Sequence, residues 1–515
     1  MEFLMGAVAI VVAALSIIAW HFICRRSSSP LNWPVVGMMP ALLWNIDNIY
    51  NYATKLVVDN GGTFKFRGPW MTRDNFFEVV TSNPANLEYI LKKDFANFPS
   101  GPYVKDVFYD IFGDGLFTAD DELWKRQRKA VAMALSSATF RDRNLFVLHK
   151  IVQEKLLPAL RLAKEKKAEI DLQDILLRFN FDSICMSVLG RDSCCLGDDI
   201  LPEISIARIF HQAVELCTYR AMLPPVIWKF MRFLNVGFEK KLCKTSAIIG
   251  EFAAEMIEAR IKEIEAEGGL SGDILSNFIE MEADERRSPS QKLLQGLILS
   301  VFLAGLDTSS SALSWFFWLV STHPNVEEKI VSEITQILKS KPLINNNKNE
   351  MGFLDLKDLR GMNYLQAALS ESMRLFPPVP VIYREATKEN ILPDGTQLRK
   401  GSKLLCFLYG TCRMETLWGG DALEFNPERW LNEEGLCRKE WDCKFPIFIA
   451  GPRVCLGKDI AYVNMKLIAA NILVHYQLKL SCARAVKPKF GLTLCFKHGL
   501  KFTLDSRKDK DLNEN

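Results

Sequence analysis

One cysteine of this chain lies in a setting that could support redox chemistry at a metal. Cys455 stands between Gly451 and Gly457, with Arg453 two residues before it and Phe448 seven residues before it. Glycines let a backbone adopt positive φ and approach a flat prosthetic group closely. Loop N–H groups could donate to the sulfur and tune it as a ligand, and Arg453 could clamp a carboxylate. The spacing predicts that Cys455 ligates a haem iron, rather than being another small buried cysteine.

The pattern F-x-x-G-x-R-x-C-x-G over residues 448–457 resembles the signature of the cytochrome P450 superfamily, the haem-thiolate monooxygenases. The resemblance implies haem b, an iron protoporphyrin IX, as the cofactor. Its thiolate ligand pushes electron density toward O–O cleavage. The resemblance also implies a mainly α fold with small β-sheets (α+β). Cys455 is then the metal ligand, and the cofactor-binding residues around it are Phe448, Gly451, Arg453 and Gly457.

An apolar run over about 290–321 predicts one long buried helix, and its centre is polar. One face combines small and apolar residues at helical spacing: Leu297, Val301, Ala304, Gly305 and Thr308. Asp307-Thr308-Ser309 could instead cap a helix start, but apolar residues on both sides argue against that. The stretch resembles the family motif A/G-G-x-D/E-T-T/S, with Ser309 at the commoner second threonine. Small residues would leave room for O2, Thr308 would hydrogen-bond it, and Asp307 would relay protons through water.

Trp124 and Arg128 are four residues apart and share a helix face. Taken alone they indicate a solvated basic helix, but they match the family's W-x-x-x-R feature, which holds a haem propionate. Arg384 could reach the other propionate. Basic residues near these motifs could steer an acidic electron donor, although charge runs are usually solvated surface. They are Lys125, Arg126, Lys129, Lys444 and Lys458.

Glu371 and Arg374 form an E-x-x-R pair, which alone is a poor signal. Arg429 follows about fifty residues later in Phe425-Asn426-Pro427-Glu428-Arg429-Trp430, as in the family. The resemblance implies that Glu371, Arg374 and Arg429 lock the fold behind the cysteine loop. Their predicted role is structural.

Several apolar segments are candidates for a substrate pocket. Residues 99–118 are aromatic and interrupted by glycines, which predicts a long irregular loop that either covers a site or lines the core. The candidate pocket residues, several of them placed by family analogy, are Phe112, Phe117, Val301, Ala304, Gly305, Val379, Val381, Leu494 and Phe496. Residues 223–233 mix aromatic and basic residues, which fits either a membrane surface or a helix–helix connection with core aromatics.

The 515 residues carry a net charge of +3, which gives no support for nucleic-acid binding. Thirteen irregularly spaced cysteines suit a reducing compartment, and six scattered histidines form no metal-site spacing. Residues 1–24 are apolar and are followed by Arg25-Arg26, which predicts a retained transmembrane anchor with a cytosolic C-terminal side rather than a cleaved signal. We expect three parts: the anchor over 1–24, a proline-rich hinge over 25–41, and a catalytic domain over 42–515.

Further elements follow from periodicity: short strands at 63–66 and 77–80, and helices near 83–91, 325–338 and 458–475. No flavin or nicotinamide fingerprint appears, so the resemblance implies NADPH electrons from a separate NADPH-cytochrome reductase. It also implies single-pass anchoring in the endoplasmic reticulum membrane.

Four further sequence segments resemble those of plant long-chain fatty-acid ω-hydroxylases and alkane mid-chain hydroxylases. They are residues 32–38, 228–237, 307–318 and 413–419. They predict hydroxylation of a long lipophilic chain. Relatives that oxidise or couple specialised metabolites such as phenolic alkaloids remain an alternative. An O2-independent isomerase or dehydratase and a non-enzymatic haem carrier are two more. The Asp307–Thr308 pair argues against the isomerase, and the apolar pocket segments argue against the carrier.

Overall fold

The protein is described here by a computed structural model covering residues 36–68, 77–197, 205–267, 274–284, 288–341, 354–481 and 486–507, with isolated positions at 16, 30, 32–33 and 286. The predicted anchor over 1–24 therefore lies almost entirely outside the described residues. Part of the predicted hinge over 25–41 is described. There Gly37 adopts φ +62° and the Met38 N–H donates to the Arg67 carbonyl at 2.7 Å, so the chain docks onto the globule before α2 begins.

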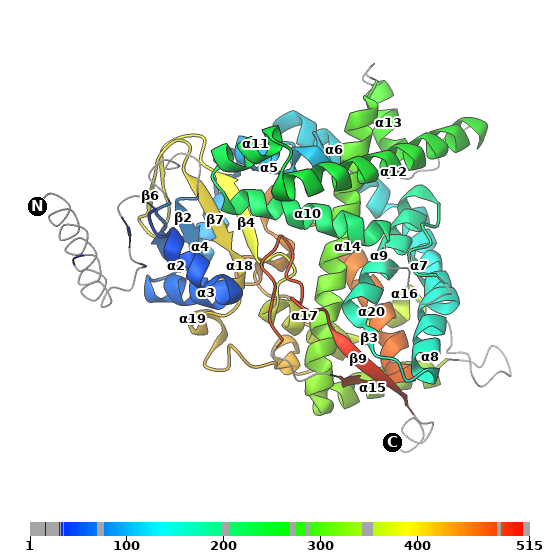
Figure 1. Ribbon diagram of the computed structural model, residues 1–515. Coiled ribbons are helices and arrows are strands. Elements are labelled where there is room, and N and C mark those ends of the chain that lie inside the picture. Colours follow the sequence, from blue (N-terminus) through cyan, green and yellow to red (C-terminus); the bar gives the residue numbers. More distant parts are fainter. Residues whose placement is uncertain are drawn as a thin grey trace, which may run out of the picture.

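Helices make up most of the described part and surround one long central helix, α14 (Figure 1). In chain order they are α2 (Met39–Trp44), α3 (Ile49–Asp59), α4 (Pro84–Glu88), α5 (Gly101–Phe112), α6 (Asp121–Ser136), α7 (Ala138–Ile151), α8 (Leu157–Glu165), α9 (Leu172–Leu189), α10 (Ile206–Met222), α11 (Pro225–Phe233), α12 (Gly237–Glu267), α13 (Ile274–Asp284), α14 (Gln291–Thr322), α15 (Pro324–Lys339), α16 (Leu356–Gly361), α17 (Asn363–Leu375), α18 (Leu408–Thr411), α19 (Glu415–Trp418) and α20 (Lys458–His475). Shorter helical turns are η1 (Ile46–Asn48), η3 (Tyr89–Lys93), η4 (Phe95–Asn97), η5 (Val152–Leu156), η6 (Pro427–Trp430), η7 (Pro446–Phe448) and η8 (Gly451–Arg453).

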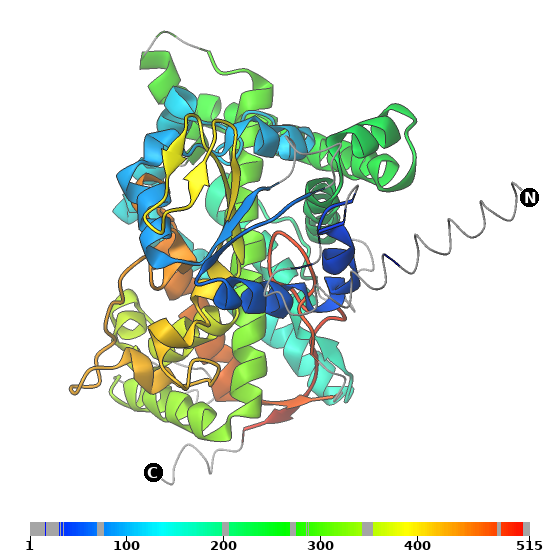
Figure 2. The same cartoon turned by 90° about the vertical axis from the view of Figure 1, so that its left-hand side faces the viewer.

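The strands form three small sheets at the side and base of the helical body (Figures 1 and 2). Their bounds are β1 (Thr63–Lys65), β2 (Val79–Thr81), β3 (Ile170–Asp171), β4 (Val381–Glu385), β5 (Asn390–Ile391), β6 (Gln397–Leu398), β7 (Lys403–Phe407), β8 (Tyr476–Leu480) and β9 (Lys501–Ser506). The sheet orders are β1-β2-β7-β4, β3-β9-β8 and β5-β6. Only β2 and β7 pair in parallel; the other pairs are antiparallel. The predicted mainly α class with small sheets is confirmed.

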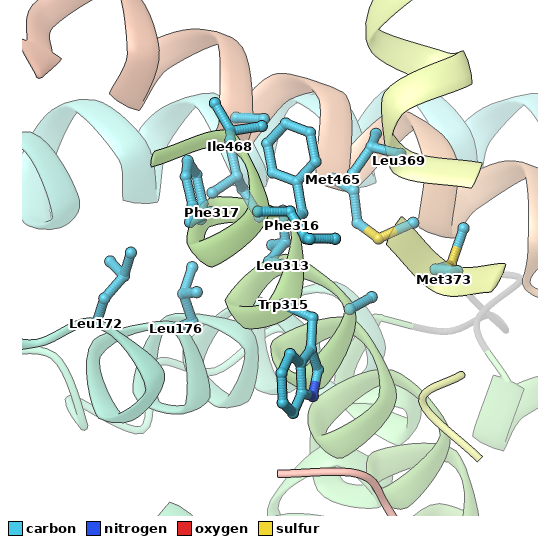
Figure 3. Packing of buried hydrophobic residues seen from close by; sticks show 14 of the residues in the cluster. Leu172, Leu176, Leu313, Trp315, Phe316, Phe317, Leu369, Met373, Met465 and Ile468 are labelled. Atoms are coloured by element: carbon cyan, nitrogen blue, oxygen red, sulfur yellow. The ribbon is translucent and has the colours of Figure 1, made fainter. Parts of the chain in front are cut away.

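The core is built on α14, which begins where its sequence provides a cap. The Ser290 side chain accepts a hydrogen bond from the Leu293 N–H, satisfying one free donor of the first turn. The C-terminal half of the helix is buried almost all round, against α9, α17 and α20. Trp315 stacks on Phe376 with ring centroids 3.8 Å apart, and Figure 3 shows its indole on the opposite side of the helix from the rings of Phe316 and Phe317. The predicted bounds of 290–321 are confirmed within one residue.

Within the described residues, α14 alone is long and apolar enough to cross a membrane. In its most apolar window, 78% of the residues are buried inside the protein. The helix is therefore accounted for by the hydrophobic core.

Two segments are helical where the sequence analysis predicts a loop or allows two interpretations. The loop predicted over 99–118 is wrong: α5 fills most of it, because Val107, Ile111 and Phe112 lie on one helical face and are buried there. The segment 223–233 forms α11 as a connection, with Trp228 fully buried. Of its other large apolar side chains, Met231 is half-buried and the rest are exposed, Phe233 by 84%.

Candidate active site

The cysteine loop lies directly before α20. The Cys455 N–H donates to the Phe448 carbonyl at 2.8 Å, which closes the loop, and the Phe448 ring packs on Tyr462 of α20 with centroids 5.4 Å apart. Burial raises the pKa of the Cys455 thiol, while an N–H donated by Gly457 and the charges of Arg128 and Lys458 oppose that rise. The start of α20 adds a positive helix end beside the sulfur. The net pKa shift of Cys455 is upward, so the free cysteine is held as a thiol, and the Gly457 N–H and the positive charges would stabilise the thiolate that a bound iron requires.

The two glycines of the loop have different tasks. Gly451 adopts φ +72°, and a Cβ there would lie 1.9 Å from the Leu91 carbonyl oxygen, so a side chain is excluded by the backbone of η3. Gly457 has an ordinary φ of −88°, and its nearest neighbour would be the Cys455 sulfur at 4.0 Å. Gly451 thus fixes the loop against the fold, and Gly457 keeps the space beside the sulfur free.

Three guanidinium groups gather beside this loop. Arg453 and Arg128 both lie over Trp124, with guanidinium carbons 4.4 and 5.6 Å from its ring centroid. Arg128 donates to the Val454 carbonyl at 2.6 Å, and Arg453 donates to Asp120 at 2.5 Å. The predicted Trp124–Arg128 pair and Arg453 are therefore brought together.

Arg384 of β4 completes this group of arginines. Its Nε, like that of Arg453, is buried without a hydrogen-bond partner among the described residues. Burial lowers the pKa of Arg384, and burial together with repulsion from Arg384 lowers the pKa of Arg453 to about 10. Buried positive charge without sufficient counter-charge is unfavourable. Asp120 alone balances little of it, so the site fits a group with two carboxylates, as the propionates of haem provide.

The central turn of α14 is open where its neighbours are buried. Ala304 is exposed and Thr308 is half-buried, although Leu303, Leu306 and Asp307 around them are buried. The Thr308 hydroxyl donates to the Ala304 carbonyl at 2.5 Å, and the helix continues without interruption. Cys455 is likewise exposed. Ala304 and Cys455 therefore keep accessible surface, which a bound macrocycle would cover.

The sequence predicts that Gly305 leaves room at the cofactor, but the structure gives another reason for its small size. A Cβ on Gly305 would lie 2.5 Å from Ile184 Cδ1 of α9, so its small size serves the packing of α14 on α9.

Asp307 contacts a residue that the sequence did not single out. The Nδ1 of His211 on α10 lies 3.0 Å from Asp307 Oδ1. The sequence shows six scattered histidines, and only the crossing of α10 near α14 distinguishes this one.

The predicted E-x-x-R unit is assembled and fully buried. Glu371 and Arg374 form two parallel bonds of 2.7 and 2.8 Å, and Arg429 Nε lies 3.3 Å from Glu371. Arg374 also donates to the carbonyls of Cys412 and Ala422. The unit therefore ties α17 to the segment that leads toward the cysteine loop.

The remaining pocket candidates vary in burial. Phe117 is 40% exposed, and Val301, Val379 and Val381 are half-buried. Phe112 is buried among aromatic rings of α5 and α10. Leu494 and Phe496 belong to the core beside Trp315, whose indole N–H donates to the Leu494 carbonyl at 2.6 Å.

The family model described as Cytochrome P450 matches residues 28–504 of this chain. The chain belongs to the cytochrome P450 family. As a cytochrome P450 it is a monooxygenase that binds haem through a cysteine thiolate, uses O2, receives electrons from a redox partner and acts on lipophilic substrates.

The relatives of this cytochrome P450 include plant proteins that align over nearly the whole chain. It is 41% identical to Cytochrome P450 86B1 of Arabidopsis thaliana over 98% of this chain and 91% of that protein. It is 34% identical to Alkane hydroxylase MAH1 of the same plant, over 92% of this chain and 93% of that protein. Noroxomaritidine synthase 2 of Narcissus pseudonarcissus is also 34% identical, over 92% and 91%.

Proposed function

We propose that this cytochrome P450 hydroxylates an unactivated C–H bond of a long-chain aliphatic substrate, a fatty acid or an alkane. The observation that carries the proposal is the full-length similarity to a protein named as an alkane hydroxylase. The apolar candidates Val301 and Ala304 on α14, together with the exposed Phe117 of the segment after α5, support an aliphatic ligand.

The chain's own residues divide the work of this reaction. When bound, haem supplies O2 activation through its thiolate-ligated iron. Cys455 provides the thiolate. The carboxylates of the haem propionates are neutralised by Arg128, Arg384 and Arg453. The Thr308 hydroxyl, which now donates to the Ala304 carbonyl, provides a hydrogen bond toward the open side of α14. Asp307 holds and passes protons as a general acid.

Electrons would come from NADPH through a separate NADPH-cytochrome reductase. The basic residues Lys125, Lys129 and Lys458 on α6 and α20 support docking of an acidic donor near the cysteine loop. We also propose that residues 1–24 anchor the chain in the endoplasmic reticulum membrane with the catalytic domain in the cytosol.

A second candidate is oxidation or coupling of a phenolic specialised metabolite. It is favoured by the noroxomaritidine synthases, which match this chain at the same identity as the alkane hydroxylase.

Membranes carrying the protein and a plant reductase test the proposal. They receive NADPH and a panel of fatty acids, alkanes and phenolic amines, and mass spectrometry detects products that have gained one oxygen or, for coupling, lost two hydrogens. We expect a hydroxylated chain, reduced about tenfold by Thr308→Ala because proton delivery and oxygen binding are impaired. Thr322→Ala is the control, since Thr322 makes the same bond to the carbonyl four residues earlier at the far end of α14. Turnover of phenolic compounds alone would replace the aliphatic assignment with the second candidate.

A further inference from the structure

The carboxylate of Asp307 is sealed from solvent except through one neighbour. Its side chain is fully buried, and Oδ2 has no hydrogen-bond partner among the described residues. The other oxygen, Oδ1, faces His211 Nδ1 at 3.0 Å. The His211 side chain keeps 26% of its surface exposed. The imidazole therefore spans from solvent to a buried acid on α14.

A small cavity lies beside this pair. Its volume is about 20 Å³, enough for one water molecule. His211 and Asp307 line it together with Glu215 of α10 and Lys489 and Thr493 of the segment before β9. Lys489 Nζ and Glu215 lie 2.5 Å apart and close the outer side with an ion pair. Polar groups thus lead from the surface to His211.

The charges around His211 favour its protonated form. Burial lowers the pKa of His211, but the charge and hydrogen bond of Asp307, with the charge of Glu215, outweigh burial and the opposing charge of Lys489, so the net shift is upward. Cys495 also faces the cavity, and burial raises the pKa of its thiol to about 12, so it stays neutral. These are the titratable groups that face the pair from α10, α14 and the segment before β9.

We propose that His211 is the positioning residue through which Asp307 is oriented and supplied with protons from solvent. The inference rests on the proposed role of Asp307 as a proton relay. In the transfer, the His211 Nδ1–H bond breaks and an Asp307 Oδ1–H bond forms, leaving a neutral imidazole and a neutral carboxyl group. Nε2 still carries its hydrogen, so the ring turns the bare Nδ1 toward solvent and takes one proton there. When Asp307 gives its proton inward, the carboxylate and imidazolium are restored.

The first test uses the full chain with haem, its reductase and whichever panel compound it oxidises. Product formed per NADPH consumed is measured from pH 6 to pH 9 for the wild type and His211→Asn. Asparagine keeps a hydrogen-bond donor near the Nδ1 position but does not titrate. We expect the wild-type yield to fall as pH rises through the pKa of His211, because the imidazolium is lost. His211→Asn is expected to give about tenfold less product at low pH and a flat profile.

The second test reads His211 without turnover. Nuclear magnetic resonance of the isotope-labelled histidines in the detergent-solubilised full chain follows each ring with pH, and His211→Asn assigns its signal. We expect His211 to titrate above the ordinary value of about 6.5 and to move to that value or below it in Asp307→Asn. His475→Asn is the control for both tests, because His475 Nδ1 bonds the Asn471 carbonyl within α20.

Two results would overturn the inference. One is an ordinary His211 titration that Asp307→Asn leaves unchanged. The other is a His211→Asn profile that keeps the wild-type pH dependence, whatever its absolute level, since that indicates a structural role only. A failure of the aliphatic assignment is recognised separately, because the protein would then turn over a phenolic compound of the panel and no fatty acid or alkane. Failure of the proposed relay in α14 is distinguished by wild-type activity in Thr308→Ala and Asp307→Asn.

Discussion

Among single residues, Arg384 carries a buried charge that no acid among the described residues balances fully. A guanidinium is always charged, so burying one without a carboxylate is costly. Arg384 donates to its neighbour's carbonyl at 2.7 Å, but its Nε has no partner among the described residues. Asp120, whose charge raises the pKa of Arg384 against the effect of burial, is already bound to Arg453. The position is explained by an anionic group that arrives with the cofactor.

Arg384→Leu is therefore expected to act in opposite directions on the two forms of the protein. The haem-free chain should gain about 1–3 kcal/mol of stability, because a desolvated polar group is removed. The haem-loaded fraction should fall, because one carboxylate loses its partner. Thermal unfolding and the carbon monoxide difference spectrum measure the two effects. Arg399→Leu, at an exposed position, should change neither; equal destabilisation of both forms by Arg384→Leu would contradict the assignment.

At the scale of elements, Gly451 couples the cysteine loop to η3. Both Gly451 and Gly435 have φ near +72°, but only Gly451 has a neighbour in the direction of a Cβ. Gly435→Ala should cost about 1 kcal/mol for backbone strain alone. Gly451→Ala should cost at least 2 kcal/mol more than that and should lower haem content, because the loop must move away from Leu91. Thermal unfolding of both variants separates the cost of backbone strain from the cost of the overlap with Leu91. Equal losses of stability in the two variants would contradict the role given to Leu91.

The elements that could be predicted from sequence are those with strong local signals. α14, α15 and α20 have long periodic patterns and recognisable ends, and their bounds lie within about one residue of those expected. α5 could not be predicted because its aromatic residues are modest helix formers and its helical face is stabilised by tertiary packing on α10, α14 and α12. The cysteine loop and E-x-x-R unit were found by motif. His211 was missed because its contact with Asp307 joins residues 96 apart in sequence.

At the scale of the whole molecule, the exposed apolar residues of α11 indicate a membrane-facing surface. Val226 is 75% exposed, Phe230 62% and Phe233 84%, whereas Trp228 on the same helix is buried against Arg220 with the guanidinium carbon 4.7 Å from the ring. One side of this short helix thus holds it to the globule, and the other side presents apolar surface to the surroundings. Large exposed apolar patches mark interaction sites. Lys229 and Arg232 of the same helix pair with Asp106 and Asp110 of α5 at 2.7 and 2.9 Å, so the apolar side chains carry the expected lipid contact.

We expect this surface to bind lipid even when the predicted anchor is removed. A chain lacking residues 1–24 should sediment with vesicles of mixed neutral and anionic lipids. The double variant Phe230→Ser with Phe233→Ser should bind at least tenfold more weakly, because burying each phenylalanine contributes roughly 1.5–3 kcal/mol. Trp44→Ser tests a second exposed aromatic side chain, on α2, which is 91% exposed. Leu423→Ser is the control, because Leu423 is 68% exposed on the segment after α19. Equal binding of the double variant and the parent chain would show that α11 does not contact the lipid, and no binding by either chain would leave the membrane attachment to the predicted anchor.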